Sequence, residues 1–406
     1  MKPLEKWCES KPGVIAKRNL IKSHLNRNVD EDKDYHVLNG FLDHFASFYY
    51  RETNHVVMLR LSEKTMSIVN AQYGGITISQ EMLWETVDWT WVDVPLNANI
   101  PQHVLESLID ESYDILVNSM SQAKKDYLGL IAKDLTPEEL FDELIEYYKL
   151  APYRDQIAGL ARKTLILKTT PSYEEEIPIG QTKIGGSPDL PLDISWPCYT
   201  NGKPLGFQAQ INLAEIDSEF KGPLLPESGI LYFFSVFGWQ DSDDADPNIP
   251  KGKYNFNWTR VIYVDTGKRT LTRLKTPDGT KQFKASAVCF VPTITFPNDK
   301  KEPALVALDA KRPAKSRIVE LAATYHAAIQ FKLGNPNRNL LLGFTEFLQD
   351  FVKDIAAHNL ILLFQLSSDG NSEMCWGDAG NLYFWISRED LQNLNFSNIY
   401  ADYQGG

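Results

Sequence analysis

The chain has 406 residues, of which 43% are hydrophobic and 23% charged, a composition typical of a globular protein. One hydrophobic core rarely supports this length, so two domains are expected. The formal net charge of -12 argues against broad binding to nucleic acid or to anionic membranes, because phosphate groups repel an acidic surface.

The four cysteines, Cys8, Cys198, Cys289 and Cys375, are far apart and form no C-x-x-C pair. This spacing fits neither a zinc site nor a disulfide framework, and it is typical of a reduced cytosolic protein. The N-terminus has no apolar signal core, and no apolar run approaches transmembrane length. We therefore expect a soluble protein of the cytoplasm with no membrane contact.

The first 126 residues mix helical and strand-like patterns. Leu4 and Cys8 share one face of a short helix, which Pro12 and Gly13 end. Apolar residues at three- and four-residue steps predict a second helix, from Pro101 to about Val117. Strand patterns occur at His55–Leu61, Thr65–Val69 and Asp88–Leu96.

Three features of this part resemble MmcQ/YjbR-like domains. They are the run WVDVPL at Trp91–Leu96, the apolar spacing of the helix that follows it, and the opening LEKWCESKPGV. The resemblance covers about residues 1–126, although Thr90 stands where that family usually has His and the family's Tyr-Pro-Phe-Gly signature is missing. It implies a compact α+β domain with helices against a twisted antiparallel sheet.

Residues 127–164 are predicted to be a helical connector. Thr136 and Glu139 form a capping box with Pro137 at the first helical position, so a helix starts there and ends near Pro152. A second short helix is expected at Asp155–Arg162.

From residue 165 onward the chain is rich in strands, turns and aromatic residues. The glycines and prolines of Gly180–Pro197 predict an ordered loop without regular ladders. A helix is expected at Ser316–Ile329. Strands are expected at Gly202–Leu213, Ser228–Phe237, Trp258–Asp265, Lys284–Pro292 and Asn359–Leu366.

One pattern occurs twice in this part of the chain. ESGILYFFS at Glu227–Ser235 is echoed by GDAGNLYFWIS at Gly377–Ser387, and each copy follows a strand that carries a glutamine, Gln210 or Gln365. Successive side chains of a strand face opposite sides, so aromatic and aliphatic residues on both sides predict a central, covered strand. We interpret the repeat as duplicated sheet architecture.

Several motifs of the larger part are similar to the YwqG-like family of bacterial proteins. They are IGGSPDLP, SWP, KPLGFQAQINL, GILYFF, LLGFTEFLQ, LLFQLSSD and WGDAGNLYF. The resemblance covers about residues 165–406, with Thr182 in place of the usual Ser and Thr345 in place of a usual Pro. The biochemical role of that family is not established, so the resemblance implies a shape and no activity.

The predicted fold class is α+β. A small N-terminal domain of helices on an antiparallel sheet (1–126) is followed by the connector (127–164) and by a larger β-rich α+β domain with two related sheet halves (165–406).

Motifs for catalysis and cofactors do not occur. The chain contains no G-x-x-x-x-G-K-S/T, G-x-G-x-x-G, G-x-S-x-G or H-E-x-x-H sequence, so no catalytic residue, cofactor or metal is assigned. The acidic loop Trp239–Asn248, with aspartates from Asp241 to Asp246, lacks the Gly and Glu positions of an EF-hand. A solvated loop is favoured there over a calcium site.

Four glutamines form the most interesting polar set: Gln208, Gln210, Gln349 and Gln365. A buried amide without a partner costs about 1–3 kcal/mol, so these side chains must find hydrogen bonds. The favoured interpretation is that they bond loop backbone such as Gly185–Pro197. The alternative is a ligand pocket that these glutamines line together with Trp196, Trp376 and Asp378, for a small molecule or peptide.

The sequence favours a non-enzymatic binding module for a protein or a small ligand. A DNA-associated regulator that uses the N-terminal domain is an alternative, because Lys and Arg cluster near the start. Residues 1–126 nevertheless hold 13 basic and 18 acidic residues, which disfavours nucleic acid. An enzyme with an unrecognised site, with carboxylates such as Asp189 and Asp378, is the third hypothesis.

Overall fold

The structure is a computed structural model that divides into two compact units. Unit 1 comprises Met1–Leu144 and Thr324–Pro336, and unit 2 comprises Ile145–Ala323 and Asn337–Gly406. The residues that the structure describes are 2–11, 14–18, 34–39, 44–50, 55–79, 90–96, 99–120, 125, 128–129, 133, 135–199, 201–236, 258–267, 269–333, 339–349, 352–376 and 380–405.

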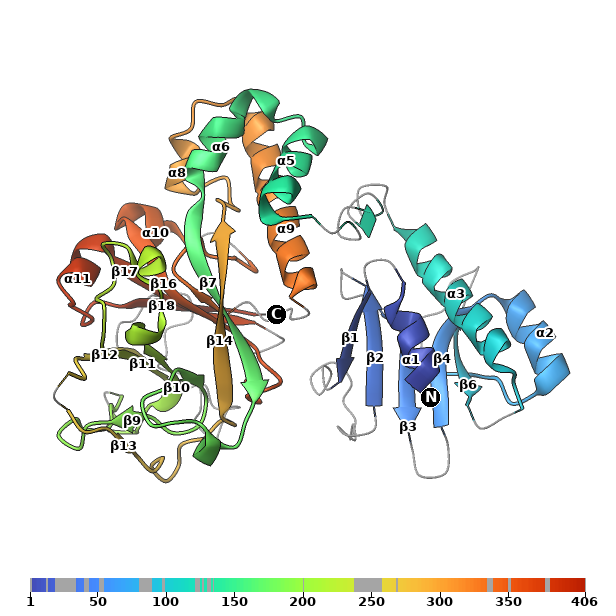
Figure 1. The fold of residues 1–406 in the computed structure, drawn as a ribbon, viewed down its shortest axis with the longest axis horizontal. Helices are drawn as coiled ribbons and strands as arrows, with labels where there is room; N and C mark the ends of the chain where they lie inside the picture. The colour runs from blue at the N-terminus through green and yellow to red at the C-terminus, as the bar shows by residue number, and fades with distance from the viewer. Residues whose placement is uncertain are drawn as a thin grey trace. The chain divides into compact units, whose positions relative to one another are not determined.

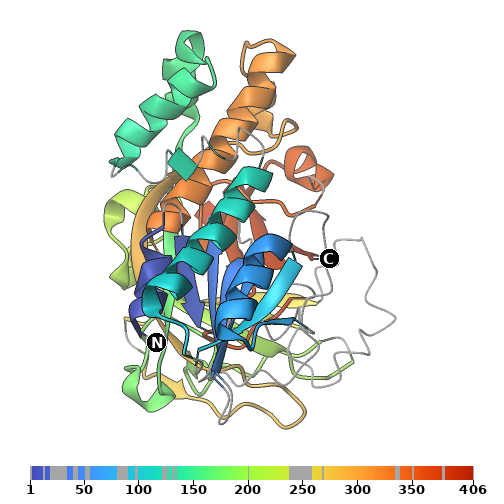
Figure 2. The same cartoon turned by 90° about the vertical axis from the view of Figure 1, so that its right-hand side faces the viewer.

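Unit 1 holds a six-stranded antiparallel sheet with the strand order β1-β2-β3-β4-β6-β5. Helix α3 lies across one face of this sheet and contacts β3 and β4 (Figures 1 and 2). The ring of Tyr113 on α3 meets Phe45 of β3 edge to face, with centroids 5.3 Å apart. The elements are α1 (Lys2–Glu9), β1 (Val14–Arg18), β2 (Asp34–Asn39), β3 (His44–Tyr50), β4 (His55–Leu61), α2 (Glu63–Tyr73), β5 (Thr77–Ile78), β6 (Thr90–Pro95) and α3 (Gln102–Ser119).

The strand predicted at Thr65–Val69 is wrong, because this segment lies inside helix α2. Ser62 caps the helix: its hydroxyl accepts a hydrogen bond from the backbone N–H of Thr65. Of the apolar residues in the segment, Val69 is buried and Ile68 is 55% exposed. A short apolar run fits both the helical and the strand periodicity of hydrophobic residues. Here the N-cap Ser62 and the Glu63 that follows it are the signal of a helix start.

The capping box predicted at Thr136 is present at the start of helix α5. The N–H of Thr136 donates to Glu139 Oε2 (2.8 Å), and the N–H of Glu139 donates to Thr136 Oγ1 (3.3 Å). Three helical segments lie between residues 137 and 160: α5 (Pro137–Tyr147), η1 (Ala151–Tyr153) and α6 (Arg154–Leu160). Two more lie between residues 303 and 332: α8 (Pro303–Val306) and α9 (Arg312–Lys332).

Unit 2 is built on a ten-stranded antiparallel sheet with the order β12-β11-β10-β8-β14-β7-β15-β16-β17-β18. Its strands are β7 (Arg162–Pro171), β8 (Lys183–Ile184), β10 (Gly206–Asn212), β11 (Ile230–Ser235), β12 (Thr259–Val264), β14 (Ser286–Thr295), β15 (Leu340–Leu341), β16 (Leu360–Ser367), β17 (Asn381–Ser387) and β18 (Tyr400–Gln404). The smaller elements are η2 (Glu174–Glu176), β9 (Asp189–Leu190), η3 (Leu213–Glu215), α7 (Ser218–Lys221), β13 (Thr272–Arg273), α10 (Lys353–Ala357) and α11 (Arg388–Gln392).

The two outer edges of this sheet approach each other. Tyr263 of β12 packs against Phe396, which precedes β18, with ring centroids 6.0 Å apart. The sheet is therefore strongly curved around its own core, as closing a twisted sheet on itself requires.

The ten strands form two related halves about the long central pair of β7 and β14 (Figure 1). Counted inward from the two edges, β12 corresponds to β18, β11 to β17, β10 to β16, β8 to β15 and β14 to β7. We call the set with β8 the first half and the set with β15 the second half.

The strand register repeats in the two halves. Gln210 of β10 lies opposite Tyr232 of β11, and Gln365 of β16 lies opposite Tyr383 of β17. Both pairs of strands carry a register shift just before the glutamine, between Phe207 and Ala209 and between Leu362 and Phe364. The echo in the sequence thus marks a duplicated sheet, as predicted.

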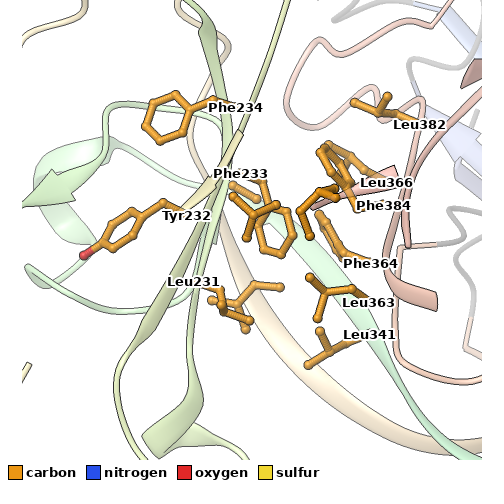
Figure 3. Packing of buried hydrophobic residues seen from close by; sticks show 14 of the residues in the cluster. Leu231, Tyr232, Phe233, Phe234, Leu341, Leu363, Phe364, Leu366, Leu382 and Phe384 are labelled. Atoms are coloured by element: carbon orange, nitrogen blue, oxygen red, sulfur yellow. The ribbon is translucent and has the colours of Figure 1, made fainter. Parts of the chain in front are cut away.

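The aromatic strands lie in the interior and are covered on both sides. Figure 3 shows Phe233 pointing toward Phe364 and Phe384, while Tyr232 points to the opposite side of its strand. The centroid of the Phe233 ring lies 4.7 Å from Phe364 and 5.1 Å from Phe384. Tyr232 and Tyr383 both have no exposed surface. The rings of Phe233, Phe364 and Phe384 lie in the core that joins the halves.

Within the described part of the chain, no helix is long and apolar enough to cross a membrane.

Candidate binding site

Gln210 and Gln365 hold equivalent loops to equivalent strands. The Oε1 of Gln210 accepts the backbone N–H of Asp189 (2.8 Å), and the Oε1 of Gln365 accepts that of Glu346 (3.0 Å). The Nε2 of Gln210 also donates to the carbonyl of Gln181 (2.7 Å). Both buried amides therefore bond loop backbone.

The facing tyrosines complete the same arrangement. The hydroxyl of Tyr232 donates to the carbonyl of Asp189, and the hydroxyl of Tyr383 donates to that of Glu346. Asp189 and Glu346 thus occupy equivalent positions, each held at its N–H by a glutamine and at its carbonyl by a tyrosine.

The other two glutamines lie in different surroundings. Gln208 is buried in β10, and its Nε2 donates to Ser235 Oγ (2.9 Å). Gln349 is exposed, and its Nε2 donates to the carbonyl of Gly405 (2.8 Å).

The two predicted pocket tryptophans are packing residues of the core. Trp196 is half-buried; its Nε1 donates to the carbonyl of Leu205 (2.8 Å), and its ring meets Phe234 edge to face. Trp376 is 1% exposed and meets Phe283. Asp378 and the acidic loop from Asp241 to Asp246 lie outside the described residues. A pocket lined by all seven predicted residues therefore stays a prediction.

A buried ionic cluster lies beneath the loop of the first half. Lys183 and Asp189 have no exposed surface, and the Nζ of Lys183 lies 3.4 Å from the Asp189 carboxylate and 3.1 Å from Glu174 Oε1. Arg273 of β13 donates two hydrogen bonds to the Asp189 carboxylate, from Nε to Oδ1 (2.8 Å) and from Nη2 to Oδ2 (3.3 Å). Two cations and two carboxylates balance in charge, as buried ions must.

The cluster joins segments that are distant in sequence. The guanidinium of Arg273 donates to the carbonyls of Glu174 and Ile177, and the N–H of Gly180 donates to Asp189 Oδ2 (2.9 Å). Strands β9 and β13 also pair at Asp189 and Arg273. The segment predicted as a loop without ladders therefore contains short strands that the cluster fixes in place.

Burial and the neighbouring charges have opposite effects on the pKa values of Lys183 and Asp189. Burial lowers the pKa of Lys183, although the neighbouring carboxylates oppose this effect. Burial alone would raise the pKa of Asp189, but the hydrogen bonds from Arg273 and the charge of Lys183 outweigh it and leave that pKa below its usual value. Asp189 therefore stays ionised at neutral pH.

The second half serves as an internal comparison for the cluster. Lys183 pairs with Gln210 in the sheet, and the residue that pairs with Gln365 in the second half is Leu340. The same scaffold thus folds with an apolar side chain at the lysine position. At the position of Asp189 the second half keeps a buried carboxylate, Glu346, so the comparison shows only that the scaffold does not need the lysine.

Three large apolar side chains lie exposed on the segments that the cluster joins. Tyr173 is 76% exposed, Ile179 52% and Leu192 78%. We call these three residues the loop surface. Tyr173 and Ile179 lie on the segment between β7 and β8, and Leu192 lies on the segment that follows β9.

Sequence reasoning missed Lys183 and Arg273 as site residues. A signal was present: Gly186 and Gly343 each precede an acidic residue by three positions, Asp189 and Glu346. Aligning the two loops on these glycines would have placed Lys183 opposite Leu340.

Taken together, the fold and the site define a duplicated antiparallel-sheet protein with an ionically braced loop surface on one half. Residues 182–405 match the family described as a domain of unknown function, DUF1963, and the chain belongs to this family. No curated protein matches the chain.

Proposed function

We propose that the protein is a non-enzymatic binding module and that the loop surface of its first half contacts a protein partner. One observation carries this proposal: the ionic cluster braces the first-half loop, while the matching second-half position holds Leu340. A buried lysine that the scaffold does not need is best explained by the shape and rigidity of the loops above it.

The burial of the charged groups supports binding over catalysis. Lys183 and Asp189 are fully buried and engaged with Arg273 and Glu174. A general base or nucleophile must come within hydrogen-bond reach of a substrate, about 2.6–3.2 Å. The cluster is better suited to hold loops than to transfer protons to a ligand.

Photocrosslinking in the source cell tests this function. A photoreactive amino acid replaces Leu192 on the loop surface or, as the control, Gln349 at the equivalent place in the second half. We expect a discrete adduct with a protein from position 192 that position 349 does not give. Failure to form an adduct at 192, or the same adducts at both positions, would contradict the proposal.

The finer family assignments also belong to this proposal. We infer a YwqG-like domain over about residues 165–406, supported by the family match, and an MmcQ/YjbR-like domain at 1–126. The α+β form of unit 1, with α3 on an antiparallel sheet, is the arrangement that the second resemblance implies. The four cysteines are far apart in the sequence and form no C-x-x-C pair, which supports a reducing, cytoplasmic location.

A further inference from the structure

We propose that Arg162 and Arg388 of unit 2 form a binding site for an oxyanion, the phosphate or carboxylate group of a ligand, and that Glu302 makes this binding sensitive to pH. These residues belong neither to the ionic cluster nor to the loop surface, so the inference goes beyond the proposed function and does not depend on it. It follows from two arginines at one end of the ten-stranded sheet whose side-chain N–H groups find no acceptor among the described residues.

The direction of the strands brings the two arginines to the same end of the sheet. Arg162 is the first residue of β7, and Arg388 is the first residue of α11, directly after β17. β7, β15, β16 and β17 are neighbours and pair antiparallel in turn, so the start of β7 and the end of β17 lie at the same end. The charge of Arg388 accordingly acts on Arg162.

The guanidinium of Arg162 is half-buried and lies over an aromatic ring. Its Cζ is 3.8 Å from the centroid of Phe344, a cation–π contact. Within the described part of the chain, its side chain makes no hydrogen bond or salt bridge, and neither does that of the exposed Arg388. Burial lowers the pKa of Arg162, because a charge taken out of water needs compensation. An anion bound by both guanidinium groups would supply that compensation.

The first half shows that the scaffold does not need an arginine at this position. Ile166 of β7 lies opposite Leu340, and Ala287 of β14 lies opposite the equivalent Lys183. Four positions before these two residues stand the arginine of β7 and, in the first half, Phe283, which is 4% exposed. The second half thus carries a guanidinium where the first half packs an apolar ring.

Charged side chains of both signs lie near the two arginines in the sequence. They belong to Lys163, Asp299, Lys300, Lys301, Glu302, Glu389 and Asp390. Lys163 pairs with Glu219 at 2.8 Å. Asp390 accepts a hydroxyl hydrogen bond (2.9 Å), and Asp299 accepts a backbone N–H (2.7 Å). The carboxyl group of this set that acts on the half-buried guanidinium is that of Glu302.

Glu302 sets the charge beside Arg162. It is 5% exposed, and burial raises its pKa to about 7, an effect that the charge of Arg162 opposes and that of Asp299 reinforces. At lower pH the carboxyl group is neutral and leaves the charge of both arginines to a ligand. At higher pH it is ionised, compensates Arg162 itself and repels an anion. An oxyanion should therefore bind more tightly at low pH.

Isothermal titration calorimetry of the full chain with sodium sulfate, sodium acetate and sodium chloride tests the inference. Sulfate has the shape of a phosphate group and acetate supplies a carboxylate, and both keep their charge between about pH 6 and pH 8. Guanidinium groups bind either oxyanion through paired N–H···O bonds. We expect saturable binding of an oxyanion but not of chloride at pH 6, and the tighter of the two identifies the ligand group as phosphate or carboxylate.

Variants locate the binding. Arg162→Gln and Arg388→Gln should each weaken it about tenfold at pH 6, the effect of losing a charge-assisted hydrogen bond. Because Arg388 is exposed, its variant tests the site even if Arg162→Gln fails to fold. Arg269→Gln changes an exposed arginine of the first half that pairs with Asp193 at 3.0 Å, and this control should bind like the wild type.

The pH dependence tests Glu302. Binding by the wild type should be about tenfold weaker at pH 8 than at pH 6, because a group with a pKa of about 7 loses most of its bound proton over this range. Glu302→Gln cannot ionise and should bind almost equally at both pH values. Equal affinity of the wild type at the two pH values overturns the role of Glu302.

The remaining outcomes decide the site itself. If neither oxyanion binds saturably at pH 6, or if Arg388→Gln binds as tightly as the wild type, the site is overturned. Photocrosslinking from position 192 reports on the loop surface and does not involve the arginines. The proposed function therefore stands or fails separately from this inference.

Discussion

Lys183 is the residue at which the two halves differ most in chemistry. It is fully buried between Asp189 and Glu174, while its counterpart Leu340 is packed in the core. Breaking one member of a buried ionic group leaves an uncompensated charge, which costs far more than the group contributes to stability. The cluster is therefore sensitive to single changes.

We expect Lys183→Met to lower the free energy of unfolding by about 3 kcal/mol, because the buried carboxylate of Asp189 and the half-buried one of Glu174 would then share only Arg273. Leu340→Met is the matched control at the equivalent position and should cost less than about 1.5 kcal/mol, as a volume-conserving core change does. Urea denaturation of both variants measures the difference. Equal small losses would show that the charges of the cluster are not coupled.

Glu302 adds a pH dependence in the second unit. Burial raises its pKa to about 7, an effect that the charge of Arg162 opposes and that of Asp299 reinforces. The unfolded carboxyl has the ordinary value of 4.5, so between about pH 4.5 and pH 7 the folded state binds more protons than the unfolded state. Stability therefore falls as pH rises through this window.

Glu302→Gln should remove this pH dependence, because the amide does not titrate. Relative to the variant, the wild type should lose about 3 kcal/mol of unfolding free energy between pH 4.5 and pH 8. Chemical denaturation of both proteins at the two pH values gives this double difference. A constant difference between them would place the carboxyl at its ordinary pKa.

At the scale of elements, the two halves share a backbone conformation: two successive residues with positive φ angles begin the loop that follows β8 or β15. Gly185 and Gly186 have φ angles of 71°, and at the same place in the second half Leu342 and Gly343 have φ angles of 62° and 90°. Two successive left-handed residues turn the chain back over the strands that carry the glutamines. Three of the four are glycines because this backbone region is costly for other residues.

Gly185→Ala should separate crowding from backbone strain. A Cβ at Gly185 would lie 2.1 Å from the carbonyl oxygen of Lys284, whereas a Cβ at Gly279, with a φ of 81°, would meet no atom within 4 Å. We expect a loss of about 1 kcal/mol for Gly279→Ala and at least about 3 kcal/mol for Gly185→Ala. Thermal melting of the two variants checks that Gly185→Ala loses more stability than Gly279→Ala. Equal losses would argue against the close contact between residue 185 and the carbonyl oxygen of Lys284.

Local patterns predicted some elements well and others poorly. The capping box at Thr136 and the helix around Leu321 follow from neighbours in the sequence, and both are confirmed. The strand prediction for Thr65–Val69 is wrong because its short apolar run fits the periodicity of a strand as well as that of the helix it forms. The strands β8 and β9 have two residues each and depend on partners far along the chain, so no local pattern marks them.

At the scale of the whole molecule, the sequence repeat predicted the duplication but not the difference between the halves. The echo GILYFF and GNLYFW lies in the buried aromatic strands, which must be alike to share one core. The ionic cluster is formed by Glu174, Lys183, Asp189 and Arg273, which are up to 99 positions apart and meet only through sheet pairing. Such contacts leave no signal in the spacing of one sequence.

The central claim is that the cluster serves the loop surface and is not required by the fold. Hydrogen–deuterium exchange on the charge-balanced variant Glu174→Gln/Arg273→Gln, which keeps the Lys183–Asp189 pair, tests it most directly. We predict faster exchange confined to residues 173–180 and 187–193, with protection of the strands and of residues 342–349 unchanged. Uniform loss of protection across the ten-stranded sheet, or no change in the two loops, would contradict the account.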